Sequence, residues 1–578
     1  MSRSLFSFSV GPVQSFISKA RKTQDLYAGS FILSYLCRTG MNKIVEYGSE
    51  IILPDPTNAY VPNRFLAIVN ETDPKKLQLI GKSVENAVRK KFINMGETIL
   101  QRLGFHNKPK GFTEQIERHL EIYWVFMPFD EKDYPDCYKN IGARLGSVKN
   151  TRCFEQLEEE PGRKCSIDGE HNALFFKGIN RGKAFITNEA IELNNISDKY
   201  LEDGEALCAI SFVKRCADKY FKSIGVDYNS DFESTSRIAL ADAITRLENT
   251  NPAYKDLSKC DFDSNVVHEL KSKQIKSEDV KDRKAKEIYE TLKEHGIEYS
   301  PYYAIMLFDG DNMGKWYCGD NLRDEVLLRE FQTKLSKDLG RFAEEVREEV
   351  LVLPKGKPVY TGGEDFLGFI NLNHLISVMK NLRERFAKID LSAYSDKTLT
   401  FSAGVAIAHF KTPLSEVLKW ARRMEQEAKN RDNNKDAFGI AVLKHAGEIE
   451  KAILPWKLEE GIWIADLIQV CLRFLNAGKF SSNFIINIDN EFSKMMVDGD
   501  LITEKINDPD GIFETELLRL LKRSCEIDSK DKSRTQEINR FWDTLRHLKT
   551  GSRELANFIN VLKIIRFLER EVKYINDN

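Results

Sequence analysis

Residues 359–370 read VYTGGEDFLGFI, and this stretch decides the fold of the second half of the chain. Two glycines and two adjacent acids stand between apolar residues, and glycine takes turn conformations that residues with a Cβ resist. We therefore expect a β-hairpin whose rigid tip carries Glu364 and Asp365.

A second acidic tip is expected nearer the N-terminus. Residues 302–314 read YYAIMLFDGDNMG, an apolar strand that ends abruptly in DGD, beginning with Asp309. If the two strands are neighbours, the carboxylates of Asp309, Glu364 and Asp365 converge. Mg²⁺ takes oxygen ligands and keeps part of its shell for water and phosphate. The two tips thus predict a Mg²⁺ or Mn²⁺ site that binds nucleotide phosphates, and the plain alternative is a pair of polar turns.

The segments around the two tips follow the order strand, helix, strand, strand, helix, strand. Apolar residues recur every three to four positions at 327–346, 374–389 and 414–429, which predicts helices, and they alternate at 398–409, which predicts a strand. This order, with helices on one face of an antiparallel sheet, is the ferredoxin-like arrangement of polymerase and cyclase palms. We assign residues 299–445 to such a palm domain.

The glycine-rich turns beside the acids offer groups that bind phosphate. Backbone amides that open a helix bind anions, and a lysine at the end of the third helix supplies a cation for the γ-phosphate. The plain alternative for that lysine is compensation of the helix dipole. The candidate nucleotide-binding residues here are Gly310, Asn312, Met313, Gly314, Lys315, Gly362, Gly363 and Lys429.

The composition limits the class of protein. The 578 residues exceed one ordinary core and predict about three or four domains, at roughly 150 residues each. A net charge of −2, from 86 basic and 88 acidic residues, gives no global attraction for nucleic acid. The 10 cysteines are scattered, the first residues lack the order of a signal peptide, and no apolar run reaches the length of a membrane span. We expect a cytoplasmic protein.

Residues 1–135 predict a first α+β domain. The turn Gly11–Pro12 before the first helix makes either an anion site or a plain connection with a solvated basic face. The expected elements are strands at 4–10, 51–53 and 122–127 and helices at 13–26, 27–47 and 75–103.

Residues 136–200 are rich in charge and glycine and contain Cys137, Cys153, Cys165 and His171. A zinc knuckle needs paired ligands such as two CxxC motifs, whereas here a lone cysteine precedes CSIDGEH. Two interpretations stay open. Cys153, Cys165 and His171 hold zinc, or the segment is a loop-rich insertion whose cysteines are merely small side chains.

Two further regions are predicted to be helical. Residues 201–298 show helical spacing at 205–221 and 235–248 and a highly charged stretch at 258–295, which together indicate a linker domain with docking surface. Residues 446–578 lack clear strands and carry helical periodicity, which predicts a C-terminal helical bundle that faces partners.

Several stretches together resemble the large polymerase/cyclase-like subunit of type III CRISPR effector complexes, in its Cmr (III-B) form. They are FSVGPVQSFISKARKTQDLYAGS, PNRF at 62–65, YYAIMLFDGDNMGKW, TGGEDF and FSAGVAIAHFKTPL, and the likeness spans nearly the whole chain. This resemblance implies an α+β multidomain protein with two palm domains, a zinc-bearing domain and a C-terminal helical domain.

The resemblance also implies an activity in antiviral defence. In that family, pairing of guide RNA with target RNA in a complex of Cmr subunits makes the second palm convert ATP into an adenylate second messenger. In most members this is cyclic oligoadenylate, and some branches join AMP to S-adenosylmethionine. The family's GGDD signature falls on Gly362, Gly363, Glu364 and Asp365, and its first-strand metal ligand falls on Asp309.

Glutamate at 364 is a departure from that signature, because GGED tends toward the GGEEF form of diguanylate cyclases. The carboxylate is kept, so metal binding should survive while the product could differ. The likeness to cyclases also favours Lys429 as a phosphate ligand.

The N-terminal part departs from the family in two ways. Many members begin with a His-Asp nuclease domain, whereas this sequence starts at the first palm, so we expect no intrinsic DNA cleavage. The first palm has no acidic tip and is interpreted as a degenerate copy. We expect it to bind an acceptor nucleotide across the interface through Gly11, Gln14 and Ser15.

Two other functions stay open at this point. A catalytically silent scaffold would bind guide RNA and small subunits and would yield no product from ATP. A free-standing cyclic-dinucleotide cyclase would act on GTP without RNA, and the lack of a sensor or dimerising segment in the sequence counts against it.

Overall fold

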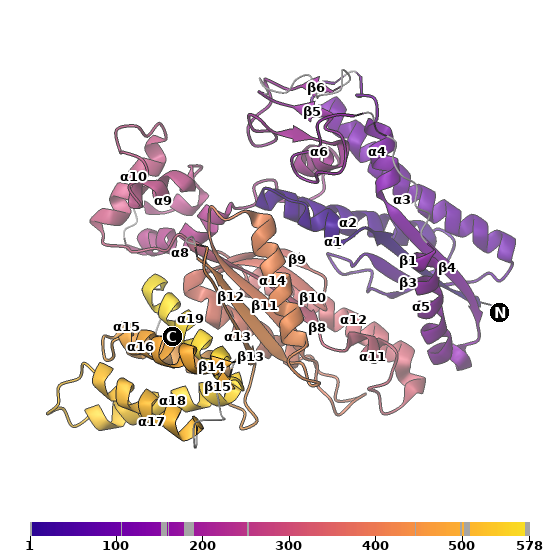
Figure 1. The fold of residues 1–578 in the computed structure, drawn as a ribbon. Helices are drawn as coiled ribbons and strands as arrows, with labels where there is room; N and C mark the ends of the chain where they lie inside the picture. The colour runs from indigo at the N-terminus through magenta and orange to yellow at the C-terminus, as the bar shows by residue number, and fades with distance from the viewer. Residues whose placement is uncertain are drawn as a thin grey trace.

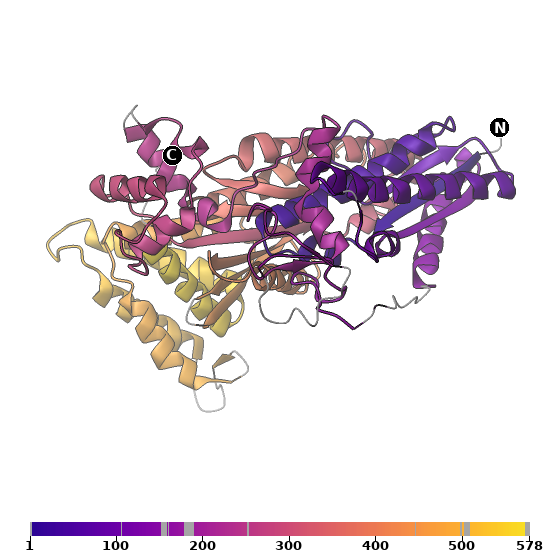
Figure 2. The same ribbon diagram turned by 90° about the horizontal axis from the view of Figure 1, so that it is seen from above.

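The computed structural model is a mixed α+β chain built of several units (Figures 1 and 2). Both views place the second palm between the first palm at one end and the C-terminal helices at the other. The described residues are 3–105, 107–151, 159, 161–178, 190–250, 254–444, 447–497, 500–501 and 509–572.

The first palm is a four-stranded antiparallel sheet in the order β2-β3-β1-β4, which is the ferredoxin-like order. Its strand β3 was not predicted, because RFLAIV follows directly on a turn-rich stretch that hides the start of the strand. Its elements are β1 (Arg3–Gly11), α1 (Gln14–Ser18), α2 (Thr23–Val45), β2 (Glu50–Leu53), β3 (Arg64–Val69), α3 (Pro74–Arg102), α4 (Phe112–His119) and β4 (Glu121–Phe129).

The break between the first two helices differs from the prediction of helices at 13–26 and 27–47. Helix α1 ends at Ser18 and α2 begins at Thr23. The carboxylate of Asp25 accepts hydrogen bonds from the backbone amides of Arg21 and Lys22, each at 3.0 Å. Side-chain acceptance of free amides at a helix start is a capping interaction, so Asp25 sets where α2 begins.

The second palm is a six-stranded sheet in the order β13-β12-β11-β8-β10-β9. Helices α12 and α13 pack on Met306 and Phe308 of β8, and α14 packs on the opposite face with Ile305. Alternate residues of a strand face opposite sides, so one strand serves both cores. The elements are β8 (Tyr302–Gly310), α11 (Met313–Tyr317), α12 (Leu328–Glu345), β9 (Gly356–Thr361), β10 (Asp365–Asn371), α13 (Leu375–Ala387), β11 (Phe401–His409), α14 (Leu414–Lys429), β12 (Ala437–Leu443) and β13 (Ile449–Pro455).

Strand β13 corrects the expectation that residues 446–578 lack strands. It pairs antiparallel with β12, and β12 pairs parallel with β11 through the crossover helix α14. Residues IEKAILP alternate between more and less buried positions, and helix α19 covers the strand. This short stretch is extended because it pairs with β12, which lies outside the stretch. Its own residue pattern therefore did not distinguish a strand from a helix.

The two palms share one hydrophobic core. Phe6 and Phe8 of β1 and Leu36 of α2 belong to the same cluster of buried side chains as Ile305 and Phe369 of the second sheet. Burial of a common apolar surface holds the two sheets in one arrangement.

The remaining elements form an insertion, a small helical unit and the C-terminal helices. Helix α5 packs on β4 of the first palm and also contacts α12 of the second. These elements are α5 (Tyr134–Asn150), β5 (Phe175–Phe176), β6 (Ile191–Glu192), β7 (Ala206–Leu207), α6 (Ala209–Arg215), α7 (Ala217–Ser223), α8 (Thr235–Thr250), α9 (Ser264–Lys271), α10 (Arg283–Glu294), α15 (Ile464–Asn476), α16 (Asn483–Phe492), β14 (Met496–Val497), β15 (Asp500–Leu501), α17 (Pro509–Ser524), α18 (Arg534–Ser552) and α19 (Leu555–Glu571).

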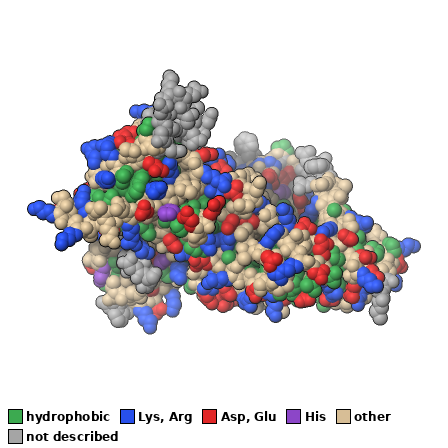
Figure 3. Space-filling model, turned by 90° about the horizontal axis from the view of Figure 1, so that it is seen from below, with side chains coloured by type: hydrophobic (Ala, Val, Ile, Leu, Met, Phe, Trp, Pro, Cys, Tyr) green, Lys and Arg blue, Asp and Glu red, His purple; other side chains and the backbone are tan. Residues whose placement is uncertain are grey.

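The surface carries charges of both signs. Basic and acidic side chains are interspersed over the face in Figure 3, in keeping with the net charge of −2. Among the described residues, none of the helices combines the length and hydrophobicity that crossing a membrane requires.

Candidate functional site

The two predicted acidic tips meet at one end of the second palm sheet. Strands β8 and β10 pair antiparallel, and the register sets Asp365 directly opposite Asp309. The backbone amide of Gly310 donates a hydrogen bond of 2.8 Å to the carbonyl of Glu364. The predicted convergence of the three carboxylates is therefore confirmed.

The two glycines before the acids serve different purposes. Gly363 has a φ of +95°, which favours glycine. Gly362 is required by close approach, since a Cβ there would lie 1.9 Å from the hydroxyl oxygen of Tyr360 and 2.2 Å from Oδ1 of Asp365. The amide of Gly362 donates to the carbonyl of Asp365 at 2.9 Å, which closes the turn.

Burial raises the pKa of two acids at the tip despite the positive charges nearby. Burial, together with the charges of Glu364 and Asp309, raises the pKa of Asp365 to about 7. Burial raises the pKa of Glu364 as well, although Arg64 Nη2 lies 3.7 Å from its Oε1. Oε2 of Glu364 is buried and makes no hydrogen bond in the described part of the chain. Converging carboxylates with an unused buried oxygen fit a divalent cation that prefers oxygen ligands.

Lys429 lies at the same tip, as the sequence suggested. It is the last residue of α14, and its Nζ lies 2.5 Å from Oδ2 of Asp309 and 2.5 Å from Oε1 of Glu425. A cation on one of the three acids is therefore in place before any ligand binds.

Asp311 belongs to a different environment from its neighbour Asp309. Its side chain is 2% exposed and accepts hydrogen bonds from Ser402 Oγ at 2.8 Å, Thr400 Oγ1 at 2.9 Å and the Asp436 amide at 3.1 Å. Asp311 thus ties the loop after β8 to β11 and to the turn before β12.

The turn after β8 only partly matches the predicted phosphate loop. Helix α11 has five residues, and Asn312 before it has a φ of +54°. The side chain of Met313 is buried, and the amide of Lys315 already donates to the carbonyl of Asn312 at 2.9 Å. The side chain of Lys315 is exposed and Gly314 lines the neighbouring pocket, so these two remain open to a ligand.

A pocket of about 460 Å³ lies between the palms, beside the acidic tip. Tyr60 and Arg64 of the first palm and Tyr138 of α5 line it opposite Glu364. Arg347 stands over the Tyr60 ring at 4.4 Å and donates to Thr361 Oγ1 at 2.6 Å, which joins the two walls.

Three predicted residues of the first palm do not line this pocket. Gly11 pairs with Glu121 at the end of β1, and Gln14 and Ser15 lie in α1. The first palm instead approaches the motif through Arg64, at the start of the unpredicted strand β3. The stretch PNRF was noticed in the sequence, but no local pattern tells which strand end faces the other palm.

The predicted zinc ligands are only partly brought together. Cys165, Asp168 and Cys208 each offer a ligand atom, and these atoms lie within 4.8 Å of one another. Nδ1 of His171 lies 3.2 Å from Oδ2 of Asp168, and Cys208 Sγ lies 3.0 Å from the same oxygen. Cys153 is outside the described residues.

Cys208 and Asp168 were not among the predicted ligands, and the structure places them beside Cys165. Cys208 lies far from Cys165 in the sequence and is not part of a CxxC motif. The spacing of the cysteines therefore did not indicate it as a ligand. Two thiols, a carboxylate and an imidazole are ligand types that zinc accepts, and the cluster fits such an ion.

The ferredoxin-like sheet with acids at the ends of β8 and β10 defines a palm domain of the polymerase and cyclase class. Residues 302–439 match the family model "Cas10/Cmr2, second palm domain", and residues 5–58 match "CRISPR-associated protein Cmr2, N-terminal". Two separate segments of the chain are thus similar to proteins of the Cas10/Cmr2 family.

Individual relatives agree with this family. The CRISPR system Cmr subunit Cmr2 of Pyrococcus furiosus is 25% identical over 84% of this chain and 66% of its own length, so the chain spans about two thirds of that relative. Two structures of type III-B Cmr-beta share the fold. The apo state has a TM-score of 0.66 at 16% identity, covering 98% of this chain and 82% of that one. The state bound to cognate target RNA has a TM-score of 0.67 at 14% identity, covering 98% and 83%.

Proposed function

We propose that the chain is an RNA-activated nucleotidyltransferase, which makes an adenylate second messenger from ATP within a type III-B Cmr complex. The observation that carries this proposal is the convergence of Asp309, Glu364 and Asp365 at one end of the second palm sheet. The product is cyclic oligoadenylate, or AMP joined to S-adenosylmethionine. Glutamate at 364 leaves both open, because it keeps the carboxylate.

Asp309, Glu364 and Asp365 would hold Mg²⁺ or Mn²⁺. Such ions lower the pKa of an attacking hydroxyl and neutralise the charge of the leaving pyrophosphate. Lys429, now paired with Asp309, would pair instead with the γ-phosphate when ATP binds. The backbone at Gly362, Gly363 and Gly314 would let the triphosphate approach closely.

The acceptor would occupy the pocket between the palms. Its wall contains Glu364 on one side and Tyr60 and Arg64 on the other. An acceptor held there faces the acids, and fixed orientation of two reactants is a large part of the rate that enzymes supply. Arg64 would pair with a phosphate or carboxylate of the acceptor.

The partners would be guide RNA, target RNA and other Cmr subunits in the cytoplasm. This part of the proposal rests on the likeness to Cas10/Cmr2 proteins and to a Cmr-beta structure bound to cognate target RNA. The cluster of Cys165, Asp168 and Cys208 would hold zinc and stiffen the insertion.

The test is to assemble the complex with cognate target RNA, ATP and Mg²⁺ or Mn²⁺, with and without S-adenosylmethionine, and to identify products by mass spectrometry. Asp365→Ala should abolish the product while assembly persists. Glu344→Ala, an exposed acid on α12, is the matched control and should retain it.

Two results would contradict the proposal. If no product forms from ATP with any target RNA, the result would favour the catalytically silent scaffold. A cyclic dinucleotide made from GTP by the purified chain without RNA would indicate a free-standing cyclase.

A further inference from the structure

A groove with a volume of about 1090 Å³ lies remote from the acidic tips. One wall comes from residues 18–24 of the first palm and from the insertion. The other comes from residues 410–422, which cover the β11–α14 loop and the first turns of α14. The groove thus lies where the two halves of the molecule meet.

The lining of this groove differs in charge from the chain as a whole. Eight of its lining residues are Lys or Arg, and only two are Glu or Asp, whereas the whole chain is nearly neutral. Nine more are Ser or Thr. Cations and hydroxyl donors gathered in one concave surface are suited to phosphate oxygens, which accept several hydrogen bonds at once.

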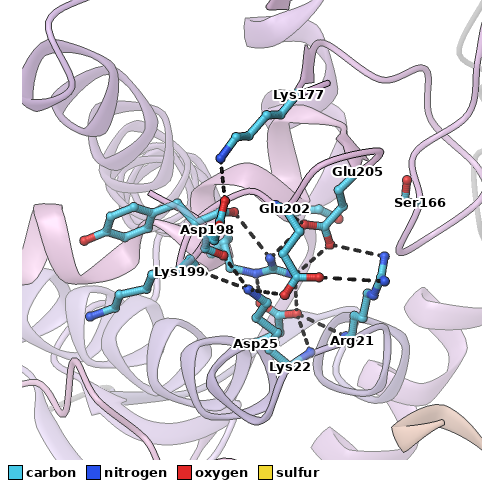
Figure 4. A network of polar contacts seen from close by, with 12 residues as sticks. Arg21, Lys22, Asp25, Ser166, Lys177, Asp198, Lys199, Glu202 and Glu205 are labelled. Atoms are coloured by element: carbon cyan, nitrogen blue, oxygen red, sulfur yellow. Dashed lines mark hydrogen bonds and ion pairs between the residues drawn. The ribbon is translucent and has the colours of Figure 1, made fainter. Parts of the chain in front are cut away.

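The first wall is built on a buried ion-pair network (Figure 4). The Arg215 side chain is 0% exposed and pairs with Asp25 at 2.5 Å and with Glu205 at 3.2 Å. Asp25 in turn holds the backbone of Arg21 and Lys22. The wall is therefore fixed in shape before any ligand arrives.

Arg21 has only weak partners on this wall. Its guanidinium nitrogens lie 3.8 Å from Glu202 and 3.9 Å from Glu205, and its side chain is 55% exposed. Ion pairs at these distances on a solvated side chain contribute little free energy. Arg21 can exchange them for a phosphate.

The second wall carries two cations without partners. In the described part of the chain, the side chains of Lys419 and Arg422 of α14 make no hydrogen bond and no ion pair. Lys419 is exposed and Arg422 is half-buried. Burial lowers the pKa of Arg422, and the charge of Glu425 opposes this shift only in part. An unpaired, partly buried guanidinium that lines a cavity is satisfied when an anion enters.

The aromatic side chains of the groove already stack on other rings of the protein. Phe232 stacks on Tyr27 and Phe410 stacks on His268, and both phenylalanines are buried. Nucleic-acid bases bind single-strand sites by stacking on accessible rings, which this groove does not offer. Its chemistry selects the phosphate backbone and not the bases.

We propose that this groove binds the phosphate backbone of a single-stranded nucleic acid without regard to sequence. Cations on both walls favour a ligand with several phosphates in a row. The inference does not rest on the proposed catalysis, because the groove contains none of the three acids. A free nucleotide offers the same phosphate chemistry on a smaller scale, and the test separates the two.

The test uses the full chain and a fluorescently labelled single-stranded oligoribonucleotide of mixed sequence, with anisotropy measured over a range of salt concentrations. The double variant Lys419→Glu/Arg422→Gln should bind the strand about tenfold more weakly. Its plot of log affinity against log salt should be shallower by about 1.4, since each phosphate contact contributes about 0.7 for single strands.

The control is Lys82→Glu/Lys90→Gln, which changes the net charge equally at two exposed positions of α3. It should bind like the wild type. Arg422 is half-buried, so weaker binding of the double variant must be distinguished from misfolding. The single variant Lys419→Glu and thermal melting of every variant make this distinction. Asp365→Ala should bind the strand unchanged even if it makes no product, which keeps this test separate from the catalytic one.

Two results would overturn the proposal. In one, the groove variant binds the strand with the affinity and salt dependence of the control. In the other, tripolyphosphate or ATP displaces the strand at equal phosphate concentration, which would assign the groove to free nucleotides.

Discussion

Asp365, a proposed metal ligand, is a residue that opposes the stability of the fold. Its carboxylate lies among two others, and its pKa is raised to about 7 by burial and by their charges. Like charges brought together in a half-buried site destabilise the folded chain unless a cation joins them. In the proposed function, binding of Mg²⁺ or Mn²⁺ at the tip would recover the free energy lost in this way.

Asp365→Asn tests this reasoning. Without divalent metal we expect the variant to be more stable than the wild type, by about 1 kcal/mol, because one of three repelling charges is gone. Mn²⁺ should raise the melting temperature of the wild type and leave that of the variant nearly unchanged. Thermal melting in chelator and in Mn²⁺ measures both effects. Equal stabilisation of the two proteins by Mn²⁺ would place the ion elsewhere.

Cys208 provides the second prediction at this scale. Cys208→Ser should lower the zinc content from about one ion per chain to nearly none, because it removes one of the thiolates that zinc prefers. Elemental mass spectrometry of the purified chain measures this. Cys260→Ser changes a free cysteine of another unit and should keep the metal. A wild-type chain without zinc, or a zinc-loaded Cys208→Ser variant, would refute the assignment.

At the scale of elements, α14 is positioned by close contact with the sheet. A Cβ at Gly404 of β11 would lie 1.9 Å from the carbonyl oxygen of Ala421, so only glycine lets the helix approach so near. The helix is about 24 Å long, from its 16 residues at about 1.5 Å each. It begins at the basic groove and ends with Lys429 on Asp309. One rigid element therefore connects the two candidate sites.

Helix α9 docks through a buried imidazole. His268 is 3% exposed, stacks on Phe410, and its Nε2 lies 3.1 Å from the carbonyl of Ser236. Its Nδ1 has no hydrogen-bond partner among the described residues, so the ring is neutral with the proton on Nε2. Burial lowers the pKa of His268 from its ordinary 6.5 to about 4, and the nearby positive charges of His409 and Lys271 act in the same direction.

This burial predicts a loss of stability in acid. The unfolded chain binds a proton at His268 below pH 6.5, and the folded chain resists it down to about pH 4. The contribution is therefore complete above pH 6.5 and falls by about 2 kcal/mol on going to about pH 5. His268→Gln should show a smaller drop in melting temperature between these pH values, and the exposed His295→Gln should behave like the wild type. Identical drops in all three proteins would contradict the role of His268.

For the whole molecule, the shared core predicts that the palms unfold together. Phe369→Ala empties a site that is 1% exposed in the cluster that also holds Phe6 and Phe8. A loss of about 3–5 kcal/mol is expected for such a truncation. Hydrogen exchange followed by mass spectrometry should show faster exchange in β1 of the first palm as well as in β8 and β10. Faster exchange confined to the second palm would mean that the palms are independent units.

Much of this architecture could be predicted from local patterns. Helix α14 was predicted with its observed bounds, and the bounds of α3 and α12 differ by one residue at each end, because long periodic segments determine their own type. Strands β3, β12 and β13 of the two palms were missed, because short extended segments take their structure from the strands with which they pair. The break before α2 was misplaced, because it depends on the side chain of Asp25.

By itself, the sequence determined the acidic tips. Two glycines before two acids and a strand ending in DGD are local features, and local backbone chemistry is enough to place Asp309, Glu364 and Asp365 at strand ends. Only the tertiary structure decided what surrounds them. Arg64 meets Glu364, Cys208 meets Cys165, and unpaired Arg422 lines a groove opposite Arg21 because elements far apart in sequence pack together. These contacts depend on the burial of one shared core, and no short segment of the sequence contains that information.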